Sequence, residues 1–121
     1  MKPLLSSKLK EFLDRFDHFK ESEIRSLEII SPTTIELTLT AQDKARAYDW
    51  LTITLLFDEV NDAKLISGSQ IAYVNLDDGI SIVTEDGFFA FCLENYKTVA
   101  SIKESSFYII SKSIKYKEGA F

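Results

Sequence analysis

Residues 50–57 restrict the fold most strongly, because they alternate over the full length of a strand. Apolar residues fall on one side and mostly polar ones on the other, with Leu51, Ile53, Leu55 and Phe57 opposite Trp50, Thr52 and Thr54. This two-residue period predicts a β-strand rather than a helix. Leu56 makes the second side partly apolar, so neighbouring strands should cover part of both faces. We therefore expect this strand to lie inside a sheet.

An amphipathic helix is predicted over residues 7–19. Its apolar side chains recur at intervals of three and four residues, at Leu9, Phe12, Leu13, Phe16 and Phe19. This spacing is typical of a helix that buries one face. Three phenylalanines in one stripe need a large apolar partner, and residues 50–57 offer one. We expect Phe12 and Phe16 to pack on Ile53 and Leu55.

Short strands account for most of the remaining chain. One hairpin is predicted from residues 23–30 and 35–40 around Pro32, and a second from 80–84 and 88–93 around Asp86-Gly87. The polar residues 42–49 should form a loop and residues 58–62 a turn, followed by a short strand at 63–66. A final bent strand, or a strand pair, is expected from 107 to about 117. Residues 70–76 and 94–104 are compatible with either a strand or a helix.

This order of elements predicts an α+β fold for a single domain, residues 1–121. The N-terminal amphipathic helix should pack on a curled, mainly antiparallel sheet of about seven strands, as a half-barrel or in two layers. No segment approaches the roughly 20 apolar residues of a membrane helix, and the first residues hold too short an apolar stretch for a signal peptide. With one cysteine and no possible internal disulfide, the expected location is the cytoplasm, without membrane contact.

Side chains with catalytic or metal-binding chemistry are few. His18 is the only histidine, and Cys92 is the only cysteine and lies in an apolar run. A catalytic triad needs three members and an oxyanion hole, and a buried thiol is a poor nucleophile. The acids at 58–62 lack the glycine and glutamate of a calcium-binding loop, and the isolated glycines form no phosphate-binding loop. We therefore expect no catalytic residues, no metal and no cofactor.

The net charge of −5 is concentrated in the middle of the chain, where residues 41–95 hold ten acids and three bases. This distribution argues against a nucleic-acid partner, because phosphate binding requires clustered lysines and arginines. It is compatible with a basic protein partner. Several of the acids at 58, 59, 62, 77, 78, 85 and 86 should gather into one acidic rim at an end of the sheet. We predict that Asp58, Asp62, Asp77 and Asp78 steer a basic partner there. The aromatic residues Trp50, Tyr48 and Tyr73 are additional interface candidates.

Two stretches resemble small bacterial β-rich domains of the immunity-protein 50 type. The first is Phe16-Asp17-His18-Phe19-Lys20-Glu21-Ser22-Glu23-Ile24, which leads into a strand. The second is Trp50-Leu51-Thr52-Ile53-Thr54-Leu55-Leu56-Phe57-Asp58-Glu59-Val60, an apolar strand that ends in Phe-x-x-Val. The resemblance implies a cytoplasmic protein that binds and neutralises a partner toxin. It implies no catalytic residues.

The main prediction is therefore a non-enzymatic, protein-binding module. Two alternatives stay open: a carrier of small apolar ligands inside the curled sheet, and an enzyme that uses unrecognised Asp, Glu or Tyr residues. A filled core would argue against the carrier. An enclosed apolar cavity of several hundred Å³, roughly, would favour it.

Overall fold

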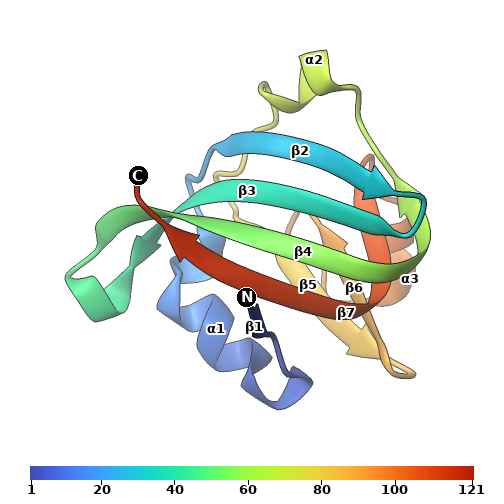
Figure 1. The fold of residues 1–121 in the computed structure, drawn as a ribbon, viewed down its shortest axis with the longest axis horizontal. Coiled ribbons are helices and arrows are strands. Elements are labelled where there is room, and N and C mark those ends of the chain that lie inside the picture. Colours follow the sequence, from blue (N-terminus) through green and yellow to red (C-terminus); the bar gives the residue numbers. More distant parts are fainter.

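The computed structural model describes the backbone of residues 1–121 and the burial of every residue except Gly68. Seven strands form one antiparallel sheet in the order β2-β3-β4-β7-β6-β5, and β1 pairs with β7. The sheet is curled and open (Figure 1), so the predicted α+β fold is confirmed. The strands are β1 (Lys2–Pro3), β2 (Ile24–Ser31), β3 (Thr34–Asp43), β4 (Asp49–Lys64), β5 (Ser81–Glu85), β6 (Phe88–Cys92) and β7 (Tyr108–Gly119).

Three short α-helices and three 3-10 turns join these strands. The helices are α1 (Leu9–Arg15), α2 (Gly68–Ile71) and α3 (Val99–Lys103), and the 3-10 turns are η1 (Ser6–Lys8), η2 (Asp17–Phe19) and η3 (Lys44–Arg46). Helix α3 falls in the range 94–104 that the sequence pattern leaves open, whereas α2 begins before the other open range, 70–76, and overlaps only its first two residues. None of the described helices is long and apolar enough to cross a membrane.

Strand β4 is the central strand, and it is longer than predicted. Its apolar side chains at 51, 53, 55 and 57 are buried as expected. The predicted turn at 58–62 and separate strand at 63–66 are wrong, because β4 continues to Lys64 alongside β7. The pairing of β4 with β7 shifts register at a bulge between Val60 and Asp62, and Glu59 has a positive φ of 52°. The polar residues there stay on the sheet because pairing with β7 satisfies their backbone groups.

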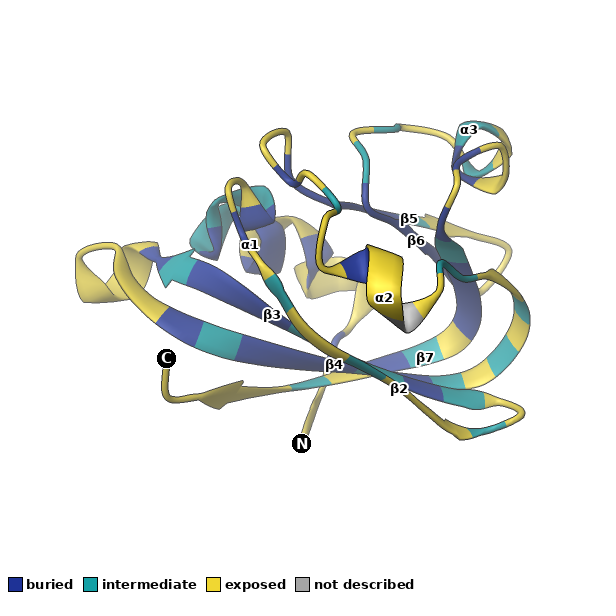
Figure 2. Ribbon diagram, turned by 90° about the horizontal axis from the view of Figure 1, so that it is seen from above, coloured by how far each residue is buried: buried dark blue, intermediate teal, exposed yellow. Residues whose placement is uncertain are grey.

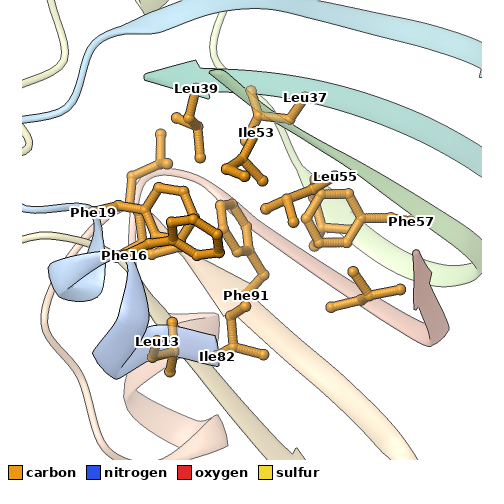
Figure 3. Close-up of a cluster of buried hydrophobic side chains, with 14 of the residues drawn as sticks. Leu13, Phe16, Phe19, Leu37, Leu39, Ile53, Leu55, Phe57, Ile82 and Phe91 are labelled. Carbon is orange, nitrogen blue, oxygen red and sulfur yellow. The ribbon is translucent and has the colours of Figure 1, made fainter. Parts of the chain in front are cut away.

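The hydrophobic core fills the concave side of the curled sheet. Figure 2 shows α1 over this side, and Figure 3 shows Phe16 and Phe19 clustered with side chains from β3, β4 and β6. Phe16 belongs to the same cluster of buried residues as Ile53 and Leu55. The Phe12 ring belongs to that cluster too and lies 4.8 Å from the ring of Tyr116 on β7. The N-terminal segment therefore closes the open side of the sheet.

The predicted helix over residues 7–19 ends early. The α-helix stops at Arg15, and Asp17, His18 and Phe19 have φ values of 54°, 55° and 58°. Phe19 keeps the spacing of a buried helical residue and is fully buried, although its backbone is left-handed. The His18 carbonyl accepts a hydrogen bond from the Ile80 N–H at 2.9 Å. Burial of Phe19 and this bond hold a conformation that L-residues rarely adopt.

Gly79 is the residue that lets the chain approach the left-handed turn. Its φ is +83°, and a Cβ at this position would overlap the carbonyl oxygen of His18. We expect Gly79→Ala to lower the free energy of unfolding by about 1–3 kcal/mol, from strain and from displacement of the turn. Gly87→Ala is the matched control, because Gly87 has a φ of +80° but no neighbour within 4 Å. Equal losses for both variants in urea titrations would show that the contact with His18 is unimportant.

An ion-pair cluster ties α1 to the sheet. The Arg15 guanidinium donates to both carboxylate oxygens of Asp43 on β3, at 3.0 and 2.8 Å, and to Glu118 on β7 at 2.7 Å. Asp43 is fully buried and also accepts a hydrogen bond from the Ala45 N–H. Its hydrogen bonds to Arg15 lower the pKa of the Asp43 carboxyl group. The predicted loop at 42–49 is shorter at both ends, because Gln42 and Asp43 belong to β3 and Asp49 begins β4.

The second predicted hairpin is confirmed as β5 and β6. Asp86 and Gly87 have φ values of 52° and 80°, as a two-residue type I′ turn requires. Helix α3 packs on the outer face of this hairpin, where Ile102 joins Ala90, Cys92 and Ile110 in a second, smaller cluster. The curled sheet is thus covered on its inner face by α1 and η2, and on part of its outer face by α3.

Candidate functional site

A groove on the outer face lies between the β5–β6 hairpin, the end of β4 and α3. It encloses about 430 Å³. Its floor is apolar and its margin is mostly acidic, with the lining formed by Asn61, Asp62, Glu85, Asp86, Phe88, Ala90, Val99, Lys103 and Ile110. We call this feature the acidic groove.

The hairpin turn places two of the acids. Because the type I′ turn at Asp86-Gly87 is tight, Glu85 and Asp86 project from the tip of the hairpin and remain exposed. The half-buried Phe88 follows the turn, and the Lys112 ammonium lies 5.8 Å from the centre of its ring. On the other side of the same tip is a second groove of about 470 Å³, next to Leu4 and Leu5. The tip therefore stands between two surface depressions.

The bulge in β4 places the third acid. Asp62 follows the extra residue Asn61, and its carboxylate accepts a hydrogen bond from the hydroxyl group of Tyr108 at 3.1 Å. Burial, and then this bond to a carboxylate, raise the pKa of Tyr108, so the tyrosine stays a neutral donor. The bulge thus fixes the Asp62 carboxylate at the groove instead of leaving it on a free turn.

The groove combines negative charge with an apolar floor. Three carboxylates line it against one ammonium group, that of Lys103. Such a surface can bind a lysine or arginine side chain, whose alkyl part packs on apolar atoms while its charged end meets a carboxylate. The arrangement is therefore suited to a basic segment of a partner.

The structure separates the four aspartates that the sequence singles out. Asp62 lines the acidic groove together with the turn acids. Asp58 accepts hydrogen bonds from Thr34 Oγ1 at 3.1 Å and from the Glu59 N–H at 2.9 Å. Asp77 and Asp78 lie in the turn before Gly79, next to η2, and Asp77 bonds to Asn75. Asp62 therefore lines the same groove as Glu85 and Asp86, and the lining described for this groove does not include the pair at 77 and 78.

Sequence reasoning did not include Phe88 and Lys103 among the site residues. The sequence pattern left strand and helix open over residues 94–104, and the structure places Val99 and Lys103 four residues apart on one face of helix α3. The Thr98 side chain, which accepts a hydrogen bond from the Ser101 N–H, caps this helix. A threonine before Val99 was the sequence signal that could have identified the helix.

The two residues considered for catalysis lie outside the groove. Cys92 is fully buried, and burial raises the pKa of its thiol, which disfavours the reactive thiolate. His18 Nε2 lies 3.0 Å from an Asp14 carboxylate oxygen on the surface of the N-terminal segment. Among the described residues, no group of three or more His, Cys, Asp or Glu side chains is arranged to hold a metal ion.

The three aromatic residues considered for an interface are all exposed. Tyr48, Trp50 and Tyr73 expose 51%, 38% and 87% of their surface. Trp50 and Tyr48 lie at the start of β4, and the acidic groove lies near its other end. Trp50 and Tyr48 therefore belong to a different surface from the groove.

Comparisons of this chain with models of known protein families, with curated proteins and with solved structures gave no match.

Proposed function

We propose that this protein is a non-enzymatic binding module that recognises a basic protein through the acidic groove. The observation that carries this proposal is the convergence of Asp62, Glu85 and Asp86 around an apolar floor. The apolar floor supplies area for contact, while exposed carboxylates favour a partner of opposite charge and speed its approach.

The filled core supports this proposal over the carrier of small apolar ligands. The concave side of the sheet, where a carrier would hold its ligand, is occupied by large side chains. Phe16, Phe19, Phe57, Phe91 and Phe107 each expose 1% or less of their surface. A ligand inside the curl would have to displace these rings, at a cost comparable to that of disrupting the core.

The resemblance to immunity proteins leads us to propose a class of partner. If it holds, the basic partner is a bacterial toxin, and binding through the acidic groove neutralises it in the cytoplasm. The negative charge of the groove and the net charge of −5 are compatible with such a target.

Charge reversal in the groove tests the proposal. The partner is first captured from bacterial lysate with the wild-type protein and identified by mass spectrometry. Association rates are then measured at low and high salt. For the Glu85→Lys/Asp86→Lys variant we expect association about tenfold slower at low salt, with a weaker salt dependence. Its melting temperature should fall only slightly, because lysine adopts the positive φ of Asp86 less readily than aspartate does.

The matched control is Asp77→Lys/Asp78→Lys, which adds the same charge next to η2. If the groove is the contact surface, this variant should change the rate much less than the groove variant. A larger effect at 77 and 78 would move the contact surface to that turn. Association rates indifferent to salt and to both reversals would contradict the proposal, and recovery of only small apolar molecules would favour the carrier.

A further inference from the structure

A small pocket lies at the opposite end of β4 from the acidic groove. It encloses about 130 Å³ and is lined by Glu21, Glu23, Thr40, Trp50 and Phe121. Figure 1 shows the C-terminal end of β7 at this end of the sheet, near the connection between β3 and β4. We call this feature the aromatic pocket.

The end of β7 brings Phe121 to the pocket. Gly119 pairs with Thr52, and a Cβ at Gly119 would lie only 2.6 Å from Thr52 Oγ1, so a glycine permits the close approach. The Thr52 hydroxyl then donates to the Ala120 carbonyl at 3.3 Å. These contacts hold the Phe121 ring 5.8 Å from the Trp50 ring, with 44° between the ring planes. Two aromatic walls are thus supplied by β4 and by the residues after β7.

The two glutamates are positioned through their backbones. The Glu21 N–H donates to the Leu76 carbonyl at 2.8 Å, and the Glu21 φ is 59°. The Glu23 N–H donates to Oγ1 of the buried Thr40 at 2.8 Å. Both side chains are exposed, and neither carboxylate forms an ion pair with a cationic side chain of the described residues. The pocket therefore presents two carboxylates that are available to a cation.

The aromatic walls also favour a cation, and one already contacts the Phe121 ring. The Arg25 guanidinium lies 4.8 Å from the centre of the Phe121 ring, in the range of a cation–π interaction. Arg25 is not part of the pocket lining, so this contact does not fill the pocket. A planar guanidinium can stack on an aromatic face and at the same time bond a carboxylate with its forked N–H groups, which the ammonium of lysine cannot do.

We propose that the aromatic pocket binds the guanidinium of an arginine side chain presented by a protein partner. Trp50 and Phe121 supply the stacking surface, and Glu21 and Glu23 supply the charge. That the arginine belongs to a protein partner rests on the proposed function. Binding of a guanidinium by the pocket does not. The pocket and the acidic groove share no lining residue, so each can be tested without the other.

Trp50 makes the pocket directly observable, because it is the only tryptophan in the chain. The full chain is titrated with N-acetyl-arginine methylamide into the millimolar range while tryptophan emission is recorded. We expect a saturable change in emission. The citrulline analogue, which has the same shape without the charge, should give no saturable change, and the lysine analogue should bind more weakly.

Variants connect the signal with the pocket. The Glu21→Gln/Glu23→Gln variant should bind the arginine probe about three- to tenfold more weakly, because two exposed charge contacts are lost. Phe121→Ala should weaken binding as well, while the groove variant Glu85→Lys/Asp86→Lys should bind normally. Melting temperatures close to that of the wild type show that the variants are folded.

Three results would overturn the inference. They are an emission response that is equal for arginine and citrulline, an affinity unchanged in the Glu21→Gln/Glu23→Gln variant, and tighter binding of lysine than of arginine. If the arginine probe binds the pocket but groove reversal leaves partner association unchanged, the pocket stands and the proposed role of the acidic groove fails.

Discussion

Replacing Phe16 with alanine is expected to lower the free energy of unfolding by about 3–5 kcal/mol. Phe16 exposes 1% of its surface, and its ring lies 5.2 Å from that of Phe12 and 5.8 Å from that of Phe19. The alanine variant loses the packing contacts of a large buried ring. The close-packed core cannot fill the cavity that remains. The measurement is a urea titration followed by circular dichroism.

Leu5→Ala is the control for this prediction. Leu5 precedes the same helical segment but is 54% exposed, so its truncation should change the unfolding free energy by about 0.5 kcal/mol or less. If Phe16→Ala behaved like Leu5→Ala, the N-terminal segment would not be docked on the sheet, and the filled concave side that argues against a carrier would be lost.

Replacing Asp43 with alanine should cost about 2–4 kcal/mol. The buried carboxylate accepts two hydrogen bonds from Arg15 and one from the backbone of Ala45. The cost stays below that of a fully buried pair because Arg15 is 34% exposed and keeps its contact with Glu118. Arg46→Ala is the matched control. Arg46 is 65% exposed and lies 3.8 Å from the same carboxylate, so its loss should change stability by about 0.5 kcal/mol or less.

The Asp43 ion pair also predicts a dependence of stability on pH. Hydrogen bonds from Arg15 lower the pKa of Asp43 in the folded state, whereas an unfolded aspartate titrates near about 3.9. The contribution is therefore complete above that unfolded value and is lost as the pH falls through the lower folded value. In Asp43→Ala the stability should decline less steeply in this acidic range. If the free energy of unfolding fell with pH in the same way in the wild type and in Asp43→Ala, the ion pair would not lower the pKa of Asp43.

The fold could be predicted where burial sets the residue period. The alternation at 51–57 and the Asp-Gly turn at 86–87 led to the correct central strand and second hairpin. The two-residue period did not predict the last part of β4, where polar residues continue the strand through its bulge to Lys64. The helical period failed at Phe19, where a left-handed backbone buries the same side chain that a continued helix would bury. Side-chain spacing alone does not distinguish these two backbones.

The candidate site was less predictable than the fold. Sequence reasoning selected acids by their position near turns, but which turns meet depends on the curl of the sheet. Asp62 lines the same groove as Glu85 and Asp86 because β7 lies between β4 and the β5–β6 hairpin in the sheet. The aromatic pocket depends on a contact between Trp50 and Phe121, which lie far apart in the chain. No local pattern in the sequence encodes such a contact.

Chemical-shift mapping tests the central proposal most directly. The ¹⁵N-labelled protein is titrated with the captured partner, and the change at each backbone amide is measured. Binding through the acidic groove predicts the largest changes at residues 61–62, 85–88 and 99–103, which surround the groove. Large changes confined to other surfaces, such as the turn at 72–78, with none at these three segments, would contradict it.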